Sequence, residues 1–494
     1  MKRQLTLAQL WALAVVVGVF AFVNTHPIRP HDFWWHIAVG REIVATHRIP
    51  TVDTFSYTMR GAPYPSYQAF WLMEVWLYLL YRAGGAALVI LAQALTLTAT
   101  YALVLLASRL EGGSWRLAAF ATLFAVALGL DDWNVRPQVA AFLIAALFLW
   151  ALTRLRHGGS PRLLLLFPPG MALWVNVHGT FPLGLGLLGL GWLDAAWEGW
   201  RSAGWKGLWR RSRPFLLTMA ASVAALLLCN PRGVGIVAYL RTLTTDPAVQ
   251  HLVPEWAPPT FQTWSGALFL LGLLFVAAVL ALSPHRPRPS ELVGFLAFGL
   301  LALKTSRGVI WFGLVMAPVL AHHLAALLAR LPKSAERDKG ESPLLNRMMA
   351  ALLLGGAFFS LPWFKPLLPL PPEKAALISP ETPVAATEVL LRDHPPGPLF
   401  HAMPFGSYLI WAAQPDYPVF VDSRIELYPL EVWLDYLRIS AAECDWEARL
   451  AHYGVRALML SPQEQPALVE AARTSPHWHE RYADDAAVIF VRTD

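Results

Sequence analysis

The stretch of the chain that most suggests chemistry is RPHDFWWHIAVGREIVATHRIPTVDTFSYT, residues 29–58. Asp32 and His36 are four residues apart, so a helix places both side chains on one face. The aromatic and apolar residues around them favour the interface between membrane and water. A carboxylate held there with little water is a candidate general base or metal ligand. The alternative is that Asp32 only caps the helix, because Asp is a favoured N-cap residue.

Two further acids follow in the same region. Glu74 lies near the centre of the apolar segment AFWLMEVWLYLLY, residues 69–81. An acid inside an apolar segment is costly, so Glu74 is expected to have either a catalytic role or a structural ion pair with an arginine. Asp53, in IPTVDTFSYT, is favoured as a turn residue that caps the next segment, with a functional role as the alternative.

Three arginines lie where apolar segments end: Arg136 in DDWNVRPQ, Arg232 in CNPRG and Arg307 in KTSRG. The planar guanidinium fork matches the oxygens of a phosphate. Arginines at the depth of the outer headgroups are therefore candidates for holding a lipid phosphate. The alternative for each one is ordinary snorkelling to the membrane surface.

Two further polar residues lie in turns between apolar segments. His178, in LWVNVHGTF, follows Asn176 in a very short turn, where both can line a cavity or simply satisfy the broken backbone. Glu255, in LVPEWAPP, lies in a longer connection and is a candidate residue for the rim of a site.

The composition is that of a membrane protein. Of the 494 residues, 56% are hydrophobic and 15% are charged, whereas soluble domains have about 25% charged residues. The net charge of +6 comes from short basic clusters between apolar runs rather than from one basic face, which argues against nucleic acid as a partner. The sequence contains no Walker loop and no dinucleotide glycine fingerprint, so nothing indicates a nucleotide-driven pump.

We predict a polytopic α-helical membrane protein with about eleven spans. Basic clusters at 2–3, 109–116, 154–162, 201–213, 286–288 and 333–347 all fall on one side of this topology. The positive-inside rule identifies that side as cytoplasmic, so the N-terminus is expected in the cytoplasm, with the first span retained as a signal anchor. The predicted spans are 6–25, 85–108, 117–131, 138–153, 163–176, 181–197, 215–230, 264–283, 291–304, 309–330 and 347–363.

The segment 69–81 decides the topology, because every later basic cluster would lie outside if it spanned the membrane. It is short and carries Glu74, so we expect an amphipathic or re-entrant helix on the outer leaflet. Residues 26–84 then form one long outer loop of a transmembrane domain, residues 1–363. Residues 364–494 alternate short apolar runs such as PLFHAM and YPVFVDS with helical stretches, which predicts a compact extracytoplasmic α/β domain.

One charged group stands out in that last region, within FVDSRIELYP. Alternation places Asp422, Arg424 and Glu426 on one side of an extended segment. We favour mutual pairing of these side chains over contact with an acceptor molecule.

This arrangement resembles the GT-C superfamily of integral-membrane glycosyltransferases, which includes protein O-mannosyltransferases and aminoarabinose transferases. The similar stretches are HDFWWHIAVGREI and IPTVDTFSYT in the first outer loop, then CNPRG and PEWAPP, and finally FGSYLIW and FVDSRIELY. The likeness covers essentially the whole chain in topology and is most specific over residues 31–84.

The resemblance implies transfer of a sugar from a polyprenyl-phosphate donor, with inversion at the anomeric carbon, on the outer face of a bacterial cytoplasmic (inner) membrane. It implies that Asp32, with Glu74, deprotonates or orients the acceptor, and that a divalent metal, Mg²⁺ or Mn²⁺, is held by Asp32, His36 and Asp53. Phe33 replaces the second acid of the protein O-mannosyltransferase pair, so a lipid or polysaccharide acceptor is favoured over a protein. The predicted substrate-binding residues are His36, Arg136, His178, Arg232, Glu255 and Arg307.

Two other functions remain open. A transporter or flippase for a lipid-linked or polar substrate predicts charged or broken helices near the midplane and a two-fold repeat, whereas the spans carry few charges and no repeat. A non-catalytic envelope assembly protein predicts that loss of Asp32 has no effect on activity.

Overall fold

The computed structural model describes residues 5–245, 248, 252–331 and 342–493, and its chain divides into two compact units. Unit 1 contains Met1–His26, Ile90–Val234 and Pro254–Lys365; unit 2 contains Pro27–Val89, Gly235–Val253 and Pro366–Asp494. The basic residues at 2–3 and 333–339, on which part of the topology prediction rests, lie outside the described residues.

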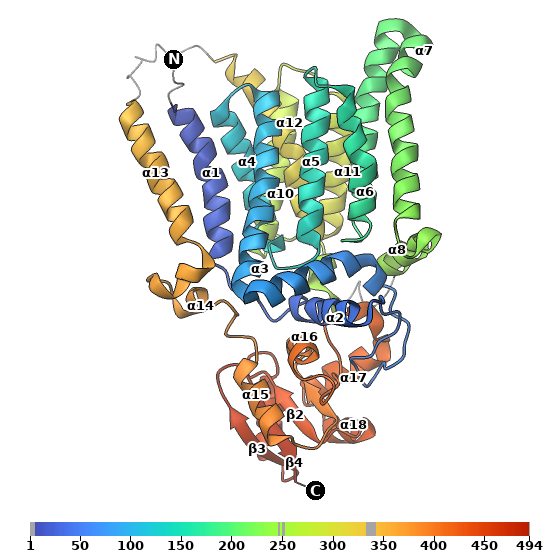
Figure 1. The fold of residues 1–494 in the computed structure, drawn as a ribbon, viewed down its shortest axis with the longest axis vertical. Helices are drawn as coiled ribbons and strands as arrows, with labels where there is room; N and C mark the ends of the chain where they lie inside the picture. The colour runs from blue at the N-terminus through green and yellow to red at the C-terminus, as the bar shows by residue number, and fades with distance from the viewer. Residues whose placement is uncertain (1–4, 246–247, 249–251, 332–341, 494) are drawn as a thin grey trace. The chain divides into compact units, whose positions relative to one another are not determined.

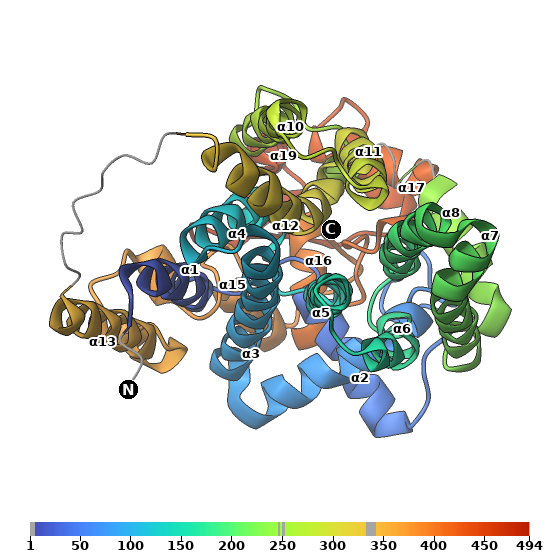
Figure 2. The same ribbon diagram turned by 90° about the horizontal axis from the view of Figure 1, so that it is seen from above.

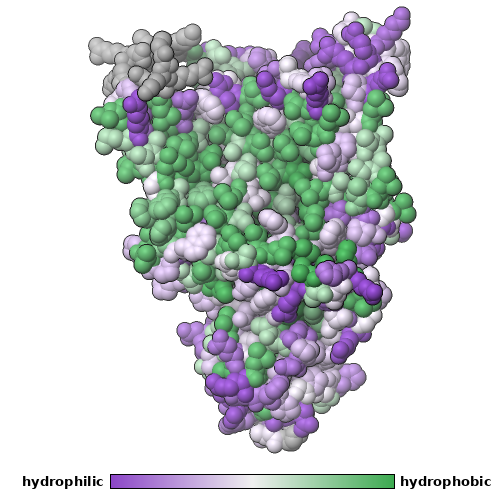
Figure 3. Space-filling view, in the orientation of Figure 1, coloured by the Kyte–Doolittle hydropathy of each residue, from purple (hydrophilic) through white to green (hydrophobic). Residues whose placement is uncertain are grey.

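Unit 1 is a bundle of helices (Figure 1). Each predicted span overlaps a helical segment, and six helices among the described residues are long and apolar enough to cross a membrane. Figure 3 shows hydrophobic side chains along the flanks of these helices. Exposed large hydrophobic residues of the bundle include Leu271, Leu300 and Leu352. The helices are α1 (Leu7–Asn24), the second part of α3 (Tyr67–Gly112), α4 (Trp115–Gly129), α5 (Gln138–Arg156), α6 (Phe167–Trp174), α7 (Pro182–Leu228), α10 (Trp264–Leu282), α11 (Pro289–Lys304), α12 (Val309–Leu328) and α13 (Pro343–Phe359).

Helix α12 forms the centre of unit 1. Seen from above, it lies among α4, α10 and α11 (Figure 2). The residues of this helix are largely buried, and a side chain at Gly313 would lie 3.3 Å from the Cα of Ala125 on α4. Small residues at a helix crossing let two backbones approach closely, which is a common way to associate helices in a membrane.

The connection between the sixth and seventh predicted spans differs from the sequence prediction. We expected a basic inner loop between the spans 181–197 and 215–230, and the structure shows that this connection is itself helical on both sides of a reversal at Ala203 and Gly204. Figure 1 shows its two arms side by side. The arms touch through backbone, because a Cβ on Gly199 would lie 2.5 Å from the carbonyl oxygen of Gly207. Tight glycine packing therefore replaces the expected loop.

The turns of unit 1 alternate between the two ends of its helices (Figure 1). The turns that follow α4, α6, the second arm of α7 and α11 share one end, which we name the turn end. The reversal of α7 and the turn between α10 and α11 lie at the other end, which we name the opposite end.

Unit 2 joins the first long loop to the C-terminal region. It contains α2 (Phe33–Thr46) and the first part of α3, which departs from helical geometry at Gly84 and Gly85. The predicted helix at 69–81 is thus present as the beginning of α3. The further helices are α8 (Ile236–Thr245), α14 (Pro372–Ala375), α15 (Val384–Asp393), α16 (Met403–Ala412), α17 (Leu430–Ser440), α18 (Trp446–His452) and α19 (Pro466–Thr474).

The predicted α/β character of the C-terminal region is confirmed by a four-stranded sheet in the order β1-β2-β4-β3. Strand β1 pairs parallel to β2, and β4 pairs antiparallel to both β2 and β3. The apolar run YPVFVDS does not form a strand of this sheet, but makes an isolated bridge between Val419 and Ser56 of the first loop. The strands are β1 (Leu399–His401), β2 (Ala457–Leu460), β3 (Trp478–Ala483) and β4 (Val488–Arg492).

Candidate functional site

Asp32 immediately precedes α2, which is the N-cap position of this helix, and its side chain is half-exposed. Its carboxylate makes no side-chain hydrogen bond that caps the helix, and its backbone is already helical, with φ −64° and ψ −26°. The capping alternative therefore does not explain the acid. His36 lies one helical turn further on and is 3% exposed.

Glu74 and His36 form a buried pair within unit 2. Glu74 is 0% exposed, and its Oε1 lies 3.1 Å from Nδ1 of His36. The structural alternative for Glu74 was an ion pair with an arginine, whereas the structure places the imidazole of His36 beside it. The histidine ring is held between Trp35 and Phe70, with ring centroids 3.6 and 5.6 Å away. The other carboxylate oxygen, Oε2, has no hydrogen-bond partner among the described residues. A buried oxygen in that state is a strong acceptor for a hydroxyl group.

Gly40 determines how closely α2 approaches the beginning of α3. A Cβ at this position would lie 2.1 Å from the peptide oxygen of Glu74 and 2.8 Å from the Cβ of Tyr78. Only glycine allows this crossing without a shift of one helix. The crossing places His36, one turn before Gly40, against the Glu74 side chain.

Asp53 belongs to a separate buried cluster of unit 2. Its carboxylate accepts hydrogen bonds from the backbone N–H groups of Phe55 (3.3 Å) and Ser56 (3.0 Å), so the predicted turn-capping role is confirmed. It also accepts a hydrogen bond from the guanidinium of Arg424 at 2.5 Å. These bonds use the lone pairs that a metal would need, so Asp53 does not fit the predicted metal set.

Arg424 is the centre of this cluster and is fully buried. It donates two hydrogen bonds to Asp422 (2.8 and 2.6 Å) and one to the hydroxyl of Tyr67 (2.5 Å). Burial acts against the charge, but Asp422, Tyr67 and the other partners outweigh it and raise the pKa of Arg424 further. The predicted pairing of Asp422 with Arg424 is confirmed. Glu426 does not join them and instead accepts hydrogen bonds from Tyr64 and Ser66.

At the turn end of unit 1, three predicted residues converge. Glu255 accepts a hydrogen bond from Arg136 at 2.6 Å and another, through its other oxygen, from Nε of Arg307 at 2.7 Å. The arginines come from the turns after α4 and α11, and Glu255 lies in the short 3-10 helix Pro254–Trp256. The side chains of all three are partly exposed, Glu255 most of all at 34%. Two guanidinium groups therefore point at one carboxylate that water can reach.

Asp132 is a fourth member of this group that sequence reasoning did not identify. Burial and the neighbouring Glu255 raise its pKa to about 8, against the opposing effect of Arg307 and Arg136. The available signal was the acidic doublet in DDWNVRPQ, four residues before Arg136. Asp132 thus carries a proton near neutral pH in a place rich in arginine.

His178 and Arg232 lie in two turns that are tied together at the same end. Asn176 donates a hydrogen bond to the carbonyl of Cys229 (2.8 Å), and Asn230 donates one to the carbonyl of Val175 (3.2 Å). The two asparagines thus fix the turn after α6 against the turn after α7. Nδ1 of His178 lies 3.3 Å from the backbone nitrogen of Thr180 and 2.9 Å from its hydroxyl, so this turn also holds the imidazole ring.

Comparison with family models finds no match, and comparison with curated protein sequences finds none either. Among solved structures, the chain is similar to the apo crystal structure of ArnT from Cupriavidus metallidurans, at 15% sequence identity and a TM-score of 0.53. The similarity covers 97% of this chain and 96% of that one. The chain therefore has the fold of that structure.

Proposed function

We propose that this protein is a glycosyltransferase that moves a sugar from a polyprenyl-phosphate donor to a lipid or glycan acceptor, on the outer face of the cytoplasmic membrane. A fold alone does not define an activity. The observation that carries the proposal is the convergence of Arg136 and Arg307 on Glu255 at the turn end of unit 1.

The arginine pair suits the phosphate of the donor. Each guanidinium offers a planar fork of donors, and two forks match the oxygens of one phosphate. In this proposal Glu255 occupies the position of that anion until the donor binds, because each of its two oxygens accepts a hydrogen bond from one arginine. Glu255 is partly exposed, so an incoming phosphate can displace it without opening a buried core.

The acceptor is activated by an acid of unit 2 in this proposal. As the acceptor oxygen attacks the anomeric carbon, its proton passes to the carboxylate of Asp32. The bond between that carbon and the phosphate oxygen breaks, polyprenyl phosphate leaves with the electron pair, and the configuration at the carbon inverts. Glu74, oriented by His36, offers its second oxygen to an acceptor hydroxyl. Under the proposed topology the N-terminus is cytoplasmic and the turn end faces outward.

The test is transfer from a panel of radiolabelled polyprenyl-phosphate sugars by purified full-length protein. The variants are Asp32→Asn and the double variant R136Q/R307Q. The matched control is R201Q, which removes an exposed arginine beside the reversal of α7, at the opposite end.

We expect Asp32→Asn to lose turnover but keep donor binding, R136Q/R307Q to lose donor binding, and the control to keep both. Equal turnover in wild type and Asp32→Asn would transfer the role of base to Glu74. Absence of turnover with every donor, while a known transferase works in the same assay, would refute the enzyme and favour the transporter or assembly protein.

A further inference from the structure

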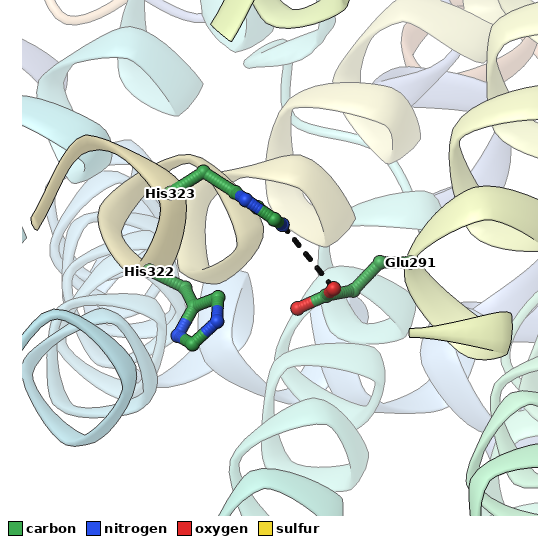
Figure 4. Close-up of side chains that lie close together, drawn as sticks. All are labelled: Glu291, His322 and His323. Atoms are coloured by element: carbon green, nitrogen blue, oxygen red, sulfur yellow. Dashed lines mark hydrogen bonds and ion pairs between the residues drawn. The ribbon is translucent and has the colours of Figure 1, made fainter. Parts of the chain in front are cut away.

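A second group of titratable side chains lies at the opposite end of unit 1, away from the Arg136–Glu255–Arg307 group. Glu291 is in the first turn of α11, and His322 and His323 are near the end of α12. Figure 4 shows both imidazole rings beside the Glu291 carboxylate. One ligand atom from each of the three residues lies within 4.8 Å of the others, and this is the one such group of three among the described residues.

The geometry of His323 is that of an oriented ligand. Its Nε2 lies 3.2 Å from Oε2 of Glu291, and its Nδ1 lies 2.7 Å from the hydroxyl of Ser283. A metal-binding histidine usually has its other nitrogen fixed by a hydrogen bond of this kind. His323 is 0% exposed and Glu291 is 2% exposed, so both groups are held in place away from solvent.

The distances are close to those of a tetrahedral zinc site. With bonds of about 2.0–2.1 Å, ligand atoms of such a site lie about 3.4 Å apart. The pair of His323 and Glu291 already has this separation. His322 offers the third ligand atom, which lies within 4.8 Å of those of Glu291 and His323. A fourth place is available to Glu111, whose Oε2 lies 3.8 Å from Nδ1 of His322, or to a water.

The surrounding charges also accommodate a cation. Glu111 pairs with Arg156 (3.3 Å) and Arg288 (3.1 Å), and Asp194 pairs with Arg156 (3.3 Å). With Glu291 the group has three carboxylates against two guanidinium groups. Buried charges are normally paired or bind metals. Glu291 is 3.9 Å from Arg288, and the group as a whole keeps one net negative charge, which favours a cation beside Glu291.

We propose that Glu291, His322 and His323 bind one Zn²⁺ that fastens the beginning of α11 to the end of α12. Nitrogen and carboxylate donors in a compact set suit zinc better than Mg²⁺, which prefers six oxygen ligands. The ion is structural, because Glu291 and His323 are almost fully buried and the group lies at the far end of the helices from the arginine pair. The proposal is independent of the sugar transfer proposed above.

The first experiment is the metal content of full-length protein, purified without chelator and without a histidine tag, by mass spectrometry. We expect about one zinc per chain, a lower thermal midpoint after EDTA, and recovery with ZnCl₂ but not with MgCl₂. A wild-type protein that stays well below one zinc per chain after incubation with ZnCl₂ would overturn the proposal.

Two substitutions of the same residue separate metal binding from hydrogen bonding. His323→Gln keeps an amide donor toward Glu291 but is a poor zinc ligand, whereas His323→Cys supplies a thiolate. We expect His323→Gln to lose zinc and the response of its midpoint to ZnCl₂, and His323→Cys to keep both. The control His157→Gln, beside Glu111 but outside the triad, should keep zinc. Equal zinc content in His323→Gln and wild type would refute the site.

Absorption spectroscopy of wild-type protein loaded with Co²⁺ gives a second measurement that does not depend on how well a variant folds. Tetrahedral Co²⁺ in this site is expected to show intense visible bands that ZnCl₂ abolishes. A weak octahedral spectrum would also contradict the proposed zinc geometry.

Discussion

Gly40 and Glu74 approach so closely that a methyl group on Gly40 would lie 2.1 Å from the peptide oxygen of Glu74. This contact joins α2 to the beginning of α3 and holds His36 against the buried carboxylate. The histidine–glutamate pair therefore depends on a residue that has no side chain.

We expect Gly40→Ala to force the two helices apart and to cost about 1–3 kcal/mol of stability, as overpacking does. Transfer activity should fall by at least tenfold, because the Glu74 carboxylate is displaced. The measurements are thermal unfolding and transfer rate. Gly186→Ala is the control, since a Cβ there meets nothing within 4 Å. Unchanged activity in Gly40→Ala would show that the crossing does not position the site.

Arg424→Met should destabilise unit 2 severely. It leaves Asp53 and Asp422 buried without their common cation, and breaking such a group costs about 3–5 kcal/mol. Arg438→Met, which removes an exposed arginine 3.9 Å from Glu443, should cost less than about 0.5 kcal/mol. Thermal unfolding of the two variants side by side measures the difference. Similar midpoints would mean that the buried cluster adds nothing to stability.

Donor binding should weaken above pH 8. The pKa of Asp132 is raised to about 8, so the group is neutral below that pH and negative above it. Its negative form lies near Arg136 and Arg307 and repels a phosphate. We expect the KM for donor to rise as the pH passes from 7 to 9, with little change in kcat.

The matched variants for this prediction are Asp132→Asn and Asp131→Asn, the second at an exposed neighbour. Asp132→Asn should give a KM that is flat across the range, and Asp131→Asn should keep the wild-type rise. A rise that persists in Asp132→Asn would assign the pH dependence to another group.

We expect the stability of unit 2 to fall in acid because of the buried His401. Burial lowers its pKa to about 4, whereas an unfolded histidine titrates near 6.5. Between these values the unfolded chain binds more protons, so the free energy of unfolding falls as the pH falls from about 6.5 to 4, by about 3 kcal/mol in total. Unfolding of His401→Gln, which still accepts the hydrogen bond from the Phe420 N–H, should depend less on pH in this window. The control His452→Gln, exposed in the same region, should behave as wild type.

Much of the fold was accessible from the sequence because hydropathy is a local property. Each predicted span overlaps a helix, and the apolar run PLFHAM contains strand β1. The helical form of the connection over residues 198–214 was not predicted, because its Trp and Arg residues resemble a basic loop although they continue the helix. Local patterns also could not show that the first long loop belongs with the C-terminal region in unit 2.

The candidate sites were accessible only in part. Arg136, Glu255 and Arg307 were each identified, but their convergence joins residues 119 and 52 positions apart and depends on tertiary packing. For Glu74 the sequence left open a catalytic role or an ion pair with an arginine, and could not identify His36 as its neighbour, because a sequence shows charge but not contact. The sequence did not indicate a site at His322 and His323, because both lie inside the apolar helix α12. Their neighbour Glu291 lies on the preceding helix, α11.

The burial of Arg424 also determines the order in which parts of the chain can fold during synthesis. The ribosome makes Asp53 371 residues before Arg424. At 5–20 residues per second, about 20–70 s pass before the cation exists. Throughout that interval Asp53 has to remain in water, because a lone carboxylate does not enter a dry core. Residues 27–89 therefore cannot complete their folding until the last part of the chain has been synthesised. A chain truncated before residue 424 has a first loop that cannot reach its native structure.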